Sequence, residues 1–600
     1  MRRVTDGPPT RARTWAAGTT KTEVVVVGSG PDGSALAWRL GELGIETLVL
    51  EAGPFHGNER WPSPHDGVGH RTADDPDSLS GALLDAQFSA REGEMNNPVD
   101  GTLRWGPADR SRPPWTRLVS GGTSIWQLAG VGGTSLHYLG NHPRAYPSAV
   151  DEQGEWPIAY ADLVPYYQYL EAELPVHPAP TAPKEALFYH GAREVGYDLL
   201  TGLNVTEAGY RPFPNAILPP DERLADTYDG DYRYPDVTGD TLSGHELQGG
   251  PHPRGAPVEQ RARRSANVAL IPRALRTGNV TVRPNAFAVD VLTVGSPGSL
   301  SATGVRFRDT WSGALRRVSA DVVVLAAGCI ETPRLWLNSG LPANEWVGRG
   351  LTTHWFDFLA GVFDADTLEE TIGQPTVDPY VGQNAAARVD LPGVGALALN
   401  AFSPGMTAVS AYANSRAGYW FETDSSDEPW DSHGRIVGRR LKELMADYER
   451  TLTVIVHTDD RPHRENGVGV DHTTVDEHGP VARVEWEPSP EDDGRREELV
   501  RQAARLLRAA GASHVHRADP GPILLHMQTT MPMGKVTDEA CEAREVDRLF
   551  VADHSVLPNG LGGANPTHTG QALALRTAEQ IAERYFEPPE SPIGTAELTR

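Results

Sequence analysis

A glycine-rich turn that follows a short apolar run constrains the fold of this chain most strongly. Four consecutive valines at 24–27 precede the motif Gly28-x-Gly30-x-x-Gly33. A β-branched run bounded by glycines predicts a strand buried on both faces, as the central strands of a parallel sheet are. Residues 34–43 then carry leucines at helical spacing, and Thr47–Leu50 has the composition of another strand. Residues 23–53 therefore predict a β-α-β unit.

Each part of this motif has a mechanical reason to bind a dinucleotide. Gly28 permits a tight turn, Gly30 lets backbone amides approach a pyrophosphate at the start of the helix, and Gly33 allows the helix to pack closely on the strand. Glu51 follows Gly33 by 18 residues and ends the second predicted strand. Its carboxylate can accept hydrogen bonds from an adenosine ribose. The motif predicts a dinucleotide cofactor and does not separate FAD from NAD.

Length and charge narrow the class of protein. The chain has 600 residues, and single cores stop growing at roughly 250–300 residues, so we expect two large lobes. It carries 54 Lys and Arg against 80 Asp and Glu, a net charge of −26. Such a surface repels phosphate backbones and anionic lipids, which disfavours nucleic-acid and membrane partners. No run approaches the roughly 20 apolar residues of a membrane span, and the first residues lack the apolar core of a secretion signal, so we expect a cytoplasmic protein.

The cysteines and the acidic stretches indicate no metal site. Cys329 and Cys541 form neither a disulfide framework nor a Cys/His cluster at zinc spacing, which favours a reducing compartment. We expect Cys329 to be a small buried residue. The acidic stretches Asp74–Asp77 and Glu491–Asp493 are expected in solvated loops.

Further elements follow from periodicity. Helical patterns occupy Tyr160–Glu173 and Glu497–Ala510, and alternation predicts a strand at Val481–Glu487. From residue 279 the chain returns to short strands, which end in a buried run at 320–328. Residues 548–585 contain a strand, a glycine loop and a long helix. The lobes are therefore expected to be discontinuous in sequence.

Several further segments carry a resemblance to a known family. They are VGGTSLHYLGNHPR at 131–144, AAGCIETPRLWLNSGLP at 326–342, VGRGLTTH at 347–354, ILLHMQTTMPMG at 523–534 and FVADHSVLPNGLGGANPTHTG at 550–570. In order, spacing and character, these segments and the dinucleotide motif resemble the glucose–methanol–choline (GMC) oxidoreductases over nearly the whole length. Within that family the likeness is greatest to pyranose oxidases and to bacterial enzymes that oxidise glycosides at a ring carbon.

The resemblance implies an α/β fold with two discontinuous domains. A Rossmann-like FAD-binding domain of the GMC type would combine 20–145, 262–350 and 516–586, and an α+β substrate-binding domain built on a β-sheet would combine 146–261 and 351–515. Residues 1–19 and 587–600 are expected to be flexible tails. The oligomeric state stays open.

The resemblance also implies a catalytic pair. His526 and Asn565, 39 residues apart, match the two catalytic positions of the family. Oxidising an alcohol requires hydride loss from carbon and proton loss from the hydroxyl. A neutral imidazole can take that proton, because its ordinary pKa is near ~6.5. Asn565 can donate to the same oxygen, while the flavin performs the redox step.

The implied FAD site draws on the dinucleotide motif and on three later segments. Its residues are Gly28, Gly30, Gly33, Glu51, Gly132, Gly133, Thr134, Ser135, His137, Ala327, Asp553, Asn565, Pro566 and Thr567. His137 matches the position where pyranose oxidases tether FAD covalently, and both a covalent and a non-covalent cofactor stay open. Leu136 and Leu139 stand where threonines are expected. Leu139 removes a hydroxyl near flavin N5, which leaves both oxygen and a quinone-type acceptor open.

The expected function is FAD-dependent oxidation of a secondary ring alcohol, at C2 or C3 of a pyranose sugar or glycoside, to a ketone, with oxygen reduced to hydrogen peroxide. One alternative is a dehydrogenase of glycosides or other alcohols that uses a quinone or another acceptor. Others are a non-redox flavoprotein or lyase, and an NAD-dependent enzyme.

The sugar contacts are the least defined part of the expected site. Asn414–Trp430 is the candidate substrate loop, and Trp355, Tyr419, Trp420 and Trp430 could lie against a pyranose ring, although core packing is the commoner use of such residues. His354, His554 and His568 are expected to be positioning or surface groups.

Overall fold

The computed structural model describes residues 21–53, 124–217, 263–587 and 592–593, apart from 126, 128, 137, 310–312, 380–381, 403–406, 409–410, 412–428, 434, 477 and 520–522. Several predictions lie outside these residues. They concern His137, the acidic stretch Asp74–Asp77, most of the substrate loop with Tyr419 and Trp420, and nearly all of both tails.

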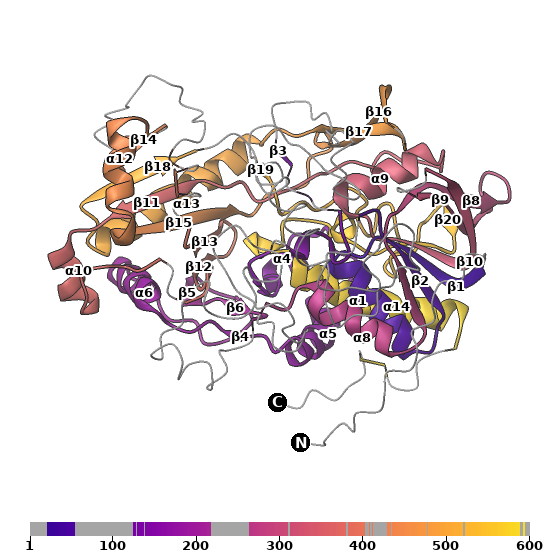
Figure 1. Ribbon diagram of the computed structural model, residues 1–600, viewed down its shortest axis with the longest axis horizontal. Coiled ribbons are helices and arrows are strands. Elements are labelled where there is room, and N and C mark those ends of the chain that lie inside the picture. Colours follow the sequence, from indigo (N-terminus) through magenta and orange to yellow (C-terminus); the bar gives the residue numbers. More distant parts are fainter. Residues whose placement is uncertain are drawn as a thin grey trace, which may run out of the picture.

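The predicted β-α-β unit forms the centre of a mixed sheet. Strand β1 (Lys21–Val27) lies between β2 (Thr47–Leu50) and β10 (Leu315–Leu325), parallel to both, and β7 (Val280–Arg283) pairs in parallel with β2. Residues 24–26 are fully buried. The expectation of a strand covered on both faces is therefore confirmed, because helices lie on either side of β1 (Figure 1).

Other strands extend this sheet on the side of β10. Strand β9 (Leu300–Asp309) runs antiparallel to the first half of β10, whereas β21 (Leu549–Val551) runs parallel to its second half. Strands β8 (Ala286–Val294) and β20 (Val546–Asp547) both pair with β9. Strands β1, β2, β10 and β21 consequently direct their carboxyl ends to one edge, where ligands of such sheets bind.

Helices lie on both sides of the first sheet. Helix α1 (Pro31–Glu42) packs between α8 (Ala266–Arg276) and α14 (Thr567–Tyr585), and α5 (Tyr160–Glu173) packs on α14. Helix α9 (Gly328–Asn338) lies on the opposite side of the sheet (Figure 1). The helix predicted at Tyr160–Glu173 is confirmed.

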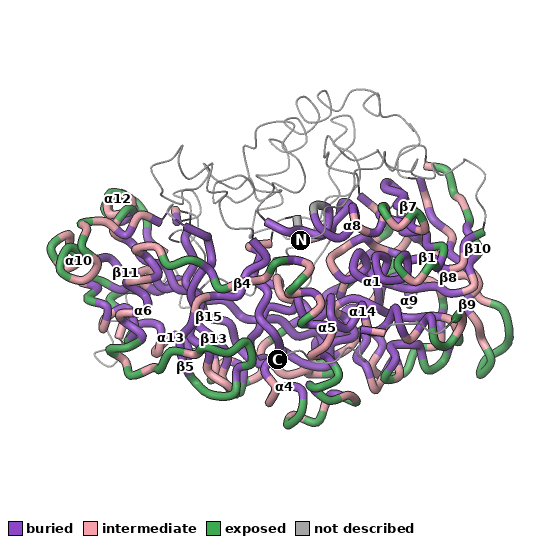
Figure 2. The backbone as a smooth tube through the Cα atoms, turned by 90° about the horizontal axis from the view of Figure 1, so that it is seen from below, coloured by how far each residue is buried: buried purple, intermediate pink, exposed green. Residues whose placement is uncertain are grey.

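A second, largely antiparallel sheet forms the other half of the molecule. Its strand order in the described residues is β14 (Ser432–His433), β18 (His514–Ala518), β11 (Phe358–Val362), β15 (Thr451–Thr458), β13 (Gly395–Leu399), β12 (Ala387–Leu391) and β5 (Gly209–Pro212). Helix α13 (Pro490–Ala509) packs on this sheet and on α6 (Pro183–Val195). Figure 2 shows buried residues running through both halves.

Shorter elements connect these layers. They are β3 (Ser124–Ile125), η2 (Gly133–Leu136), α4 (Pro147–Asp151), β4 (His177–Pro178), β6 (Pro214–Asn215), α10 (Ala365–Ile372), α12 (Arg439–Ala446), η4 (Tyr448–Arg450), β16 (Gly467–Asp476), β17 (Gly479–Glu485), β19 (Ile523–Leu524), η5 (His554–Val556) and η6 (Leu561–Gly563). The α/β fold class is confirmed, while the domain bounds given above stay predictions. Within the described ranges, no helix is long and apolar enough to cross a membrane.

The acidic stretch Glu491–Asp493 is not a solvated loop, so that expectation is wrong. These residues form the first turn of α13, which starts earlier than the helix predicted at Glu497–Ala510. The Ser489 side chain caps the helix by accepting from the Asp492 amide at 3.0 Å, and Asp492 is only 3% exposed. Acidic side chains are favoured there because the helix N-terminus carries a partial positive charge.

Candidate active site

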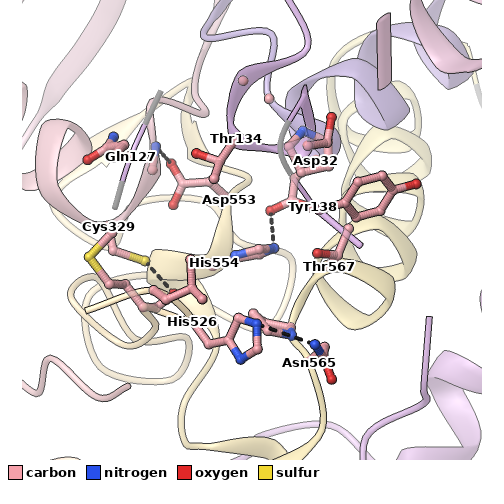
Figure 3. A pocket seen from close by; sticks show the side chains of 18 of the residues that line it. Asp32, Gln127, Thr134, Tyr138, Cys329, His526, Asp553, His554, Asn565 and Thr567 are labelled. Atoms are coloured by element: carbon pink, nitrogen blue, oxygen red, sulfur yellow. Dashed lines mark hydrogen bonds and ion pairs between the residues drawn. The ribbon is translucent and has the colours of Figure 1, made fainter. Parts of the chain in front are cut away.

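A cavity of about 360 Å³ joins the two sheets. One end lies at the carboxyl ends of β1 and β2, where Gly28, Gly30 and Glu51 line it. The other end reaches β13 and β15 of the second sheet through Ala398, Ile455 and His457. His526 and Asn565 lie on its wall (Figure 3). The cavity therefore brings both ends of the sequence to the place where the parallel strands end.

The first glycine turn has the geometry of a ligand cradle. Gly28 has a φ of +106°, and a Cβ there would lie 2.2 Å from the Ala326 carbonyl oxygen. A Cβ on Gly33 would lie 2.4 Å from the Gly28 carbonyl oxygen, so this glycine allows the close helix–strand contact. Gly30, in contrast, lines the cavity and has open space where a Cβ would be. Of these three glycines, Gly30 is therefore the one that leaves open space for a ligand in the cavity.

Glu51 closes the same end of the cavity. Its carboxylate accepts hydrogen bonds from the Ser29 amide at 2.9 Å, the Ser29 hydroxyl at 2.7 Å and the Gly53 amide at 2.9 Å. Burial raises the pKa of Glu51, and these donors oppose that rise. The carboxylate is thus oriented at the cavity wall, where it can reach a ribose hydroxyl.

The second glycine turn packs against the first. Gly133, Thr134 and Ser135 line the cavity, and a Cβ on Gly133 would lie 2.7 Å from Gly30 Cα. Gly132 does not line the cavity, since it packs against Asn267. Leu139 lies on the wall. The structure does not describe His137, and its covalent link to a cofactor stays a prediction.

The remaining predicted cofactor residues line the cavity at the starts of two helices. Ala327 precedes α9, and Asp553 accepts from the Gly328 amide at 2.9 Å and the Thr332 hydroxyl at 2.6 Å. Asn565, Pro566 and Thr567 lie at the start of α14. These amino-terminal ends carry partial positive charge that favours an anionic or electron-rich ligand.

The predicted catalytic side chains are in contact. Asn565 Nδ2 lies 3.3 Å from His526 Nε2. His526 Nδ1 lies 3.0 Å from Nδ1 of His354. Burial, with a further contribution from the cationic Arg388, lowers the pKa of His526 well below its ordinary value. His526 is therefore a neutral imidazole at neutral pH.

His457 completes a group of three histidines and was missed by the sequence analysis. Its ring lies 5.4 Å from that of His526 and 5.7 Å from that of His354, measured between centroids. Every residue of its strand, β15, is buried, so no alternation marks it as a cavity residue. Ring nitrogens of the three residues lie within 4.8 Å of one another. Burial lowers the pKa of all three, and the positive charge of Arg388 adds to this effect and opposes a metal ion.

The other two singled-out histidines are not surface groups. His568 is fully buried and bonds the His142 carbonyl oxygen through Nδ1 at 2.9 Å. His554 lines the cavity and lies 3.2 Å from Asp32 (Figure 3). Burial opposes the charge of His554, but Asp32 outweighs it and raises the pKa. Cys329 is buried as expected, and burial raises the pKa of its thiol well above the ordinary value.

The aromatic wall differs from the expectation. Trp355 and Trp430 are buried in the core beneath Arg496 and Arg517, respectively, and neither lines the cavity. The wall is formed instead by phenylalanines and aliphatic residues, namely Phe356, Phe358, Phe402, Ile455 and Leu525. Consecutive residues alternate here, so Trp355 and Asp357 face Arg496 while the phenylalanines face the cavity.

Polar atoms on the same wall lack partners. Within the described residues, no hydrogen bond is found for Asn384 Oδ1, Asn400 Oδ1, His457 Nδ1 or Asn565 Oδ1, although all four residues are buried. Buried acceptors are normally satisfied, and such groups call for an explanation. These four point to a ligand that donates several hydrogen bonds.

The fold and the glycine-lined end of the cavity together define a dinucleotide-binding protein. Family models described as GMC oxidoreductase match residues 234–356 and 462–574. The chain belongs to the GMC oxidoreductase family, whose members act on CH–OH groups and typically bind FAD. The resemblance inferred from the sequence is therefore confirmed at the level of the family.

Three characterised relatives span different shares of the chain. A 2-methyl-1,2-propanediol dehydrogenase of Mycolicibacterium austroafricanum is 28% identical over 78% of this chain and 83% of its own. A 6'''-hydroxyparomomycin C oxidase of Streptomyces lividus is 29% identical over 87% of this chain and 85% of its own length. A C-glycoside 3-oxidase of Arthrobacter globiformis is 28% identical over 47% of this chain and 50% of its own length.

Proposed function

We propose that this protein is an FAD-dependent enzyme that oxidises a secondary ring hydroxyl of a pyranose sugar or glycoside, at C2 or C3, to a ketone. The observation that carries the proposal is the neutral His526 beside Asn565 in a cavity whose wall holds unpartnered acceptors. Molecular oxygen, reduced to hydrogen peroxide, is the proposed final acceptor.

The cavity fits the cofactor along its length. Gly30 offers open space at the start of α1 for a pyrophosphate, and Glu51 offers acceptors for a ribose. The start of α14, at Asn565–Thr567, faces the end where a flavin ring would lie. When bound, the isoalloxazine supplies the two-electron acceptor for the hydride.

The proton of the substrate hydroxyl is transferred to a protein side chain. His526 accepts the hydroxyl proton at a ring nitrogen as the C–H bond breaks, and Asn565 Nδ2, 3.3 Å from His526 Nε2, can donate to the substrate oxygen. Because burial keeps His526 neutral, it is in the basic form before substrate enters. The carbonyl product forms as the proton and the hydride leave.

The polar wall supports a sugar over a simple alcohol. Asn384 Oδ1, Asn400 Oδ1 and His457 Nδ1 can each accept from a hydroxyl that does not react. Phe356 and Phe402 provide apolar faces for the C–H groups of a pyranose ring. The names of two relatives, an aminoglycoside oxidase and a C-glycoside oxidase, agree with this substrate class.

A second candidate is a dehydrogenase that passes electrons to a quinone or another acceptor. Leu139 lies on the cavity wall, where the resemblance expects a hydroxyl beside flavin N5, and one relative is named a dehydrogenase. With a glycoside substrate the two candidates share the reductive half-reaction and differ in the acceptor, and the second candidate also includes the oxidation of other alcohols.

The test is a screen of free sugars, O-glycosides and C-glycosides with the FAD-loaded protein. Anaerobic bleaching of the flavin spectrum identifies the substrate, and NMR of the product locates the carbonyl. Peroxide formation in air supports the oxidase, whereas reduction of a quinone dye without peroxide supports the dehydrogenase. If no sugar or glycoside bleaches the flavin, the proposed substrate class is wrong. If other alcohols also fail to bleach it, a non-redox or lyase function takes its place.

Two variants link the activity to the site. His526→Ala should lower the rate of flavin reduction by about 10²–10⁴-fold, because a general base is lost. His472, which is exposed on β16, provides the matched control His472→Ala with an unchanged rate. Acid precipitation tests the tether, since FAD held through His137 would remain with the pellet.

A further inference from the structure

A histidine acts as a base only through a ring nitrogen that carries no proton. His526 has two candidates, Nδ1 facing His354 and Nε2 facing Asn565. The position of its one proton therefore decides whether the lone pair faces His354 or Asn565. The partners of His354 settle this position.

His354 is anchored to a backbone carbonyl. Its Nε2 lies 3.1 Å from the carbonyl oxygen of Gly560, an atom that only accepts hydrogen bonds, and 3.4 Å from Nε2 of Gln528, a donor. The carbonyl is the nearer partner and can be satisfied only by a donor, so His354 Nε2 carries a proton. Burial lowers the pKa of His354 to about 4, which leaves the ring neutral at neutral pH. The single proton is thus on Nε2, and Nδ1 holds a lone pair.

The lone pair of His354 determines the state of its neighbour. His354 Nδ1 accepts at 3.0 Å, so His526 Nδ1 must donate and must carry the proton of that ring. His526 Nε2 is then unprotonated, and it accepts from Asn565 Nδ2. If His354 carried its proton on Nδ1 instead, its Nε2 lone pair would face the carbonyl oxygen of Gly560.

We propose that His354 is a positioning residue that holds His526 in the Nδ1–H tautomer, with the Gly560 carbonyl as the anchor. The lone pair of the base is thereby kept on Nε2, the nitrogen beside Asn565. The inference rests on the proposed role of His526 as the base, and it assigns a function to a residue that does not itself touch the reacting atoms.

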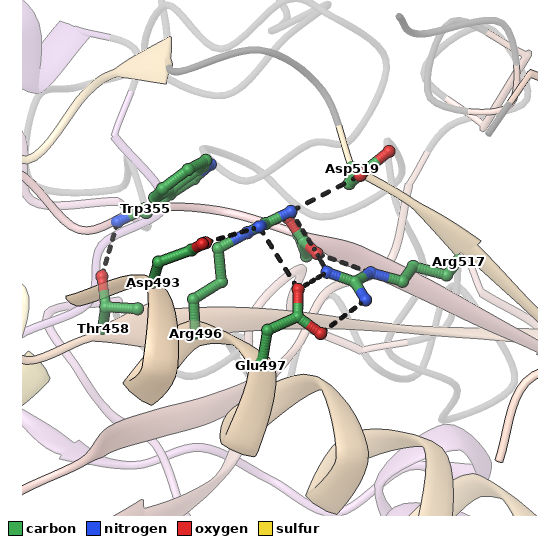
Figure 4. A network of polar contacts seen from close by, with 8 residues as sticks. Trp355, Thr458, Asp493, Arg496, Glu497, Arg517 and Asp519 are labelled. Carbon is green, nitrogen blue, oxygen red and sulfur yellow. Dashed lines mark hydrogen bonds and ion pairs between the residues drawn. The ribbon is translucent and has the colours of Figure 1, made fainter. Parts of the chain in front are cut away.

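The segment around His354 is held firmly enough for this role. Asp357, three residues on, pairs with Arg496 at 2.9 Å and with Arg517 at 2.7 Å, both from the second half of the molecule. Figure 4 shows the Arg496 side chain beside Trp355, whose backbone amide donates to the Thr458 hydroxyl at 2.8 Å. On the other side, a Cβ on Gly560 would lie 2.6 Å from the Asp460 carbonyl oxygen, so the anchor is also closely packed.

The proposed tautomer can be read directly by ¹⁵N NMR of the FAD-loaded protein labelled at histidine. Signals of His526 are assigned by their loss in His526→Gln. In the wild type we expect a protonated Nδ1 and an unprotonated Nε2. A protonated Nε2 in the wild type would overturn the proposal, whether or not any sugar is oxidised, so this arm is independent of the proposed function.

Two substitutions then test whether His354 sets the tautomer of His526. His354→Leu removes the acceptor, whereas His354→Gln retains an acceptor for His526 and a donor for Gly560. In the Leu variant the His526 proton should move to Nε2, where Asn565 Oδ1, which has no other partner, can accept it. The Gln variant should keep the wild-type NMR signals, and if the Leu variant also kept them, His354 would not set the tautomer.

Kinetics provide the second readout. With a substrate found by the screen, the limiting rate of flavin reduction should fall about 10²-fold in His354→Leu, as expected for a base in the wrong tautomer. It should stay within about tenfold of the wild type in His354→Gln, with the substrate Kd little changed in both. A Leu variant as fast as the wild type, or a loss confined to Kd, would contradict a positioning role.

A pH profile separates this role from a general packing defect. The titratable or charged groups that act on His354 and His526 are His457, Arg388 and His554. In His354→Gln these groups are unchanged, so the shape of the profile should be retained. A shifted profile in the Gln variant would indicate that charge, and not the hydrogen bond, is the contribution of His354.

Discussion

His554 Nε2 lies 3.2 Å from Asp32 Oδ2, where the first turn of α1 meets the first turn of α14. Gly570 of α14 covers the pair, since a Cβ there would lie 2.4 Å from His554 Cδ2 and 2.7 Å from the Asp32 carboxylate. Both residues line the cavity. Burial raises the pKa of Asp32, but His554 opposes that rise, so the carboxylate at the cofactor end of the cavity is compensated by an imidazolium.

This pair makes stability depend on pH. Asp32 raises the folded-state pKa of His554 above its ordinary value of 6.5. The stabilisation is therefore fully present below pH 6.5 and is lost as the pH rises through the folded-state pKa. His554→Gln should cost about 1–2 kcal/mol at pH 6, less than the ~3–5 kcal/mol of a fully buried pair, because Gln can still donate to Asp32. Urea unfolding of the wild type and of His554→Gln at pH 6 and pH 9 provides the measurement. The difference in unfolding free energy between the two proteins should be smaller at pH 9 than at pH 6. An equal or larger difference at pH 9 would contradict the charged pair.

Gly30 and Gly33 should respond differently to the same substitution. Gly30→Ala places a methyl group in open cavity space, so it should leave the stability of the apoprotein unchanged and weaken FAD binding at least tenfold. Gly33→Ala meets the Gly28 carbonyl and should destabilise the fold by about 1–3 kcal/mol. Thermal unfolding of the apoprotein and fluorescence titration with FAD separate the two effects. Normal FAD affinity in Gly30→Ala would argue against a cofactor at this turn.

The base should remain active in mild acid. Burial lowers the pKa of His526 well below its ordinary value. The rate of flavin reduction should therefore stay constant as the pH falls from 8 to 6.5, and decline only well below that. Stopped-flow reduction across this range provides the measurement. A decline centred at pH 6.5 or higher would mean that His526 is not buried as described or is not the base.

Local patterns predicted the parts of the fold in which neighbours in sequence are neighbours in space. The β-α-β unit is of this kind, because Gly28, Gly30 and Gly33 each act within one turn and its adjoining strand. His526 and Asn565 were found through the family resemblance, which supplies a pairing that periodicity does not. Their contact depends on the strands and the helix that bring the two segments together.

The substrate wall could not be predicted in the same way. Asn384, Asn400 and His457 come from separate segments of the second sheet, and each has the pattern of an ordinary buried residue. Trp355 and Phe356 are adjacent in sequence, and which of the two faces the cavity depends on how the second sheet packs against them. Trp355 was the candidate, but its neighbour Phe356 lines the wall because Arg496 covers the indole.

An unpartnered acceptor on this wall gives the sharpest test of a sugar substrate. Asn400 is 8% exposed, and its Oδ1 has no partner among the described residues. Asn400→Leu should raise the sugar Kd about tenfold, equivalent to about 1.4 kcal/mol, while the limiting rate of flavin reduction stays within about threefold. Its melting temperature should be unchanged or higher, because a buried polar group without a partner is replaced by an apolar one.

The matched control for Asn400→Leu is the same change at a satisfied asparagine away from the cavity. Asn466 exchanges hydrogen bonds of 2.8 and 2.9 Å with the backbone of Glu487. Asn466→Leu should therefore lower the melting temperature and leave the sugar Kd unchanged. The opposite pattern, with Asn400→Leu destabilised and its sugar Kd unaltered, would show that Asn400 supports the fold and does not contact a sugar hydroxyl.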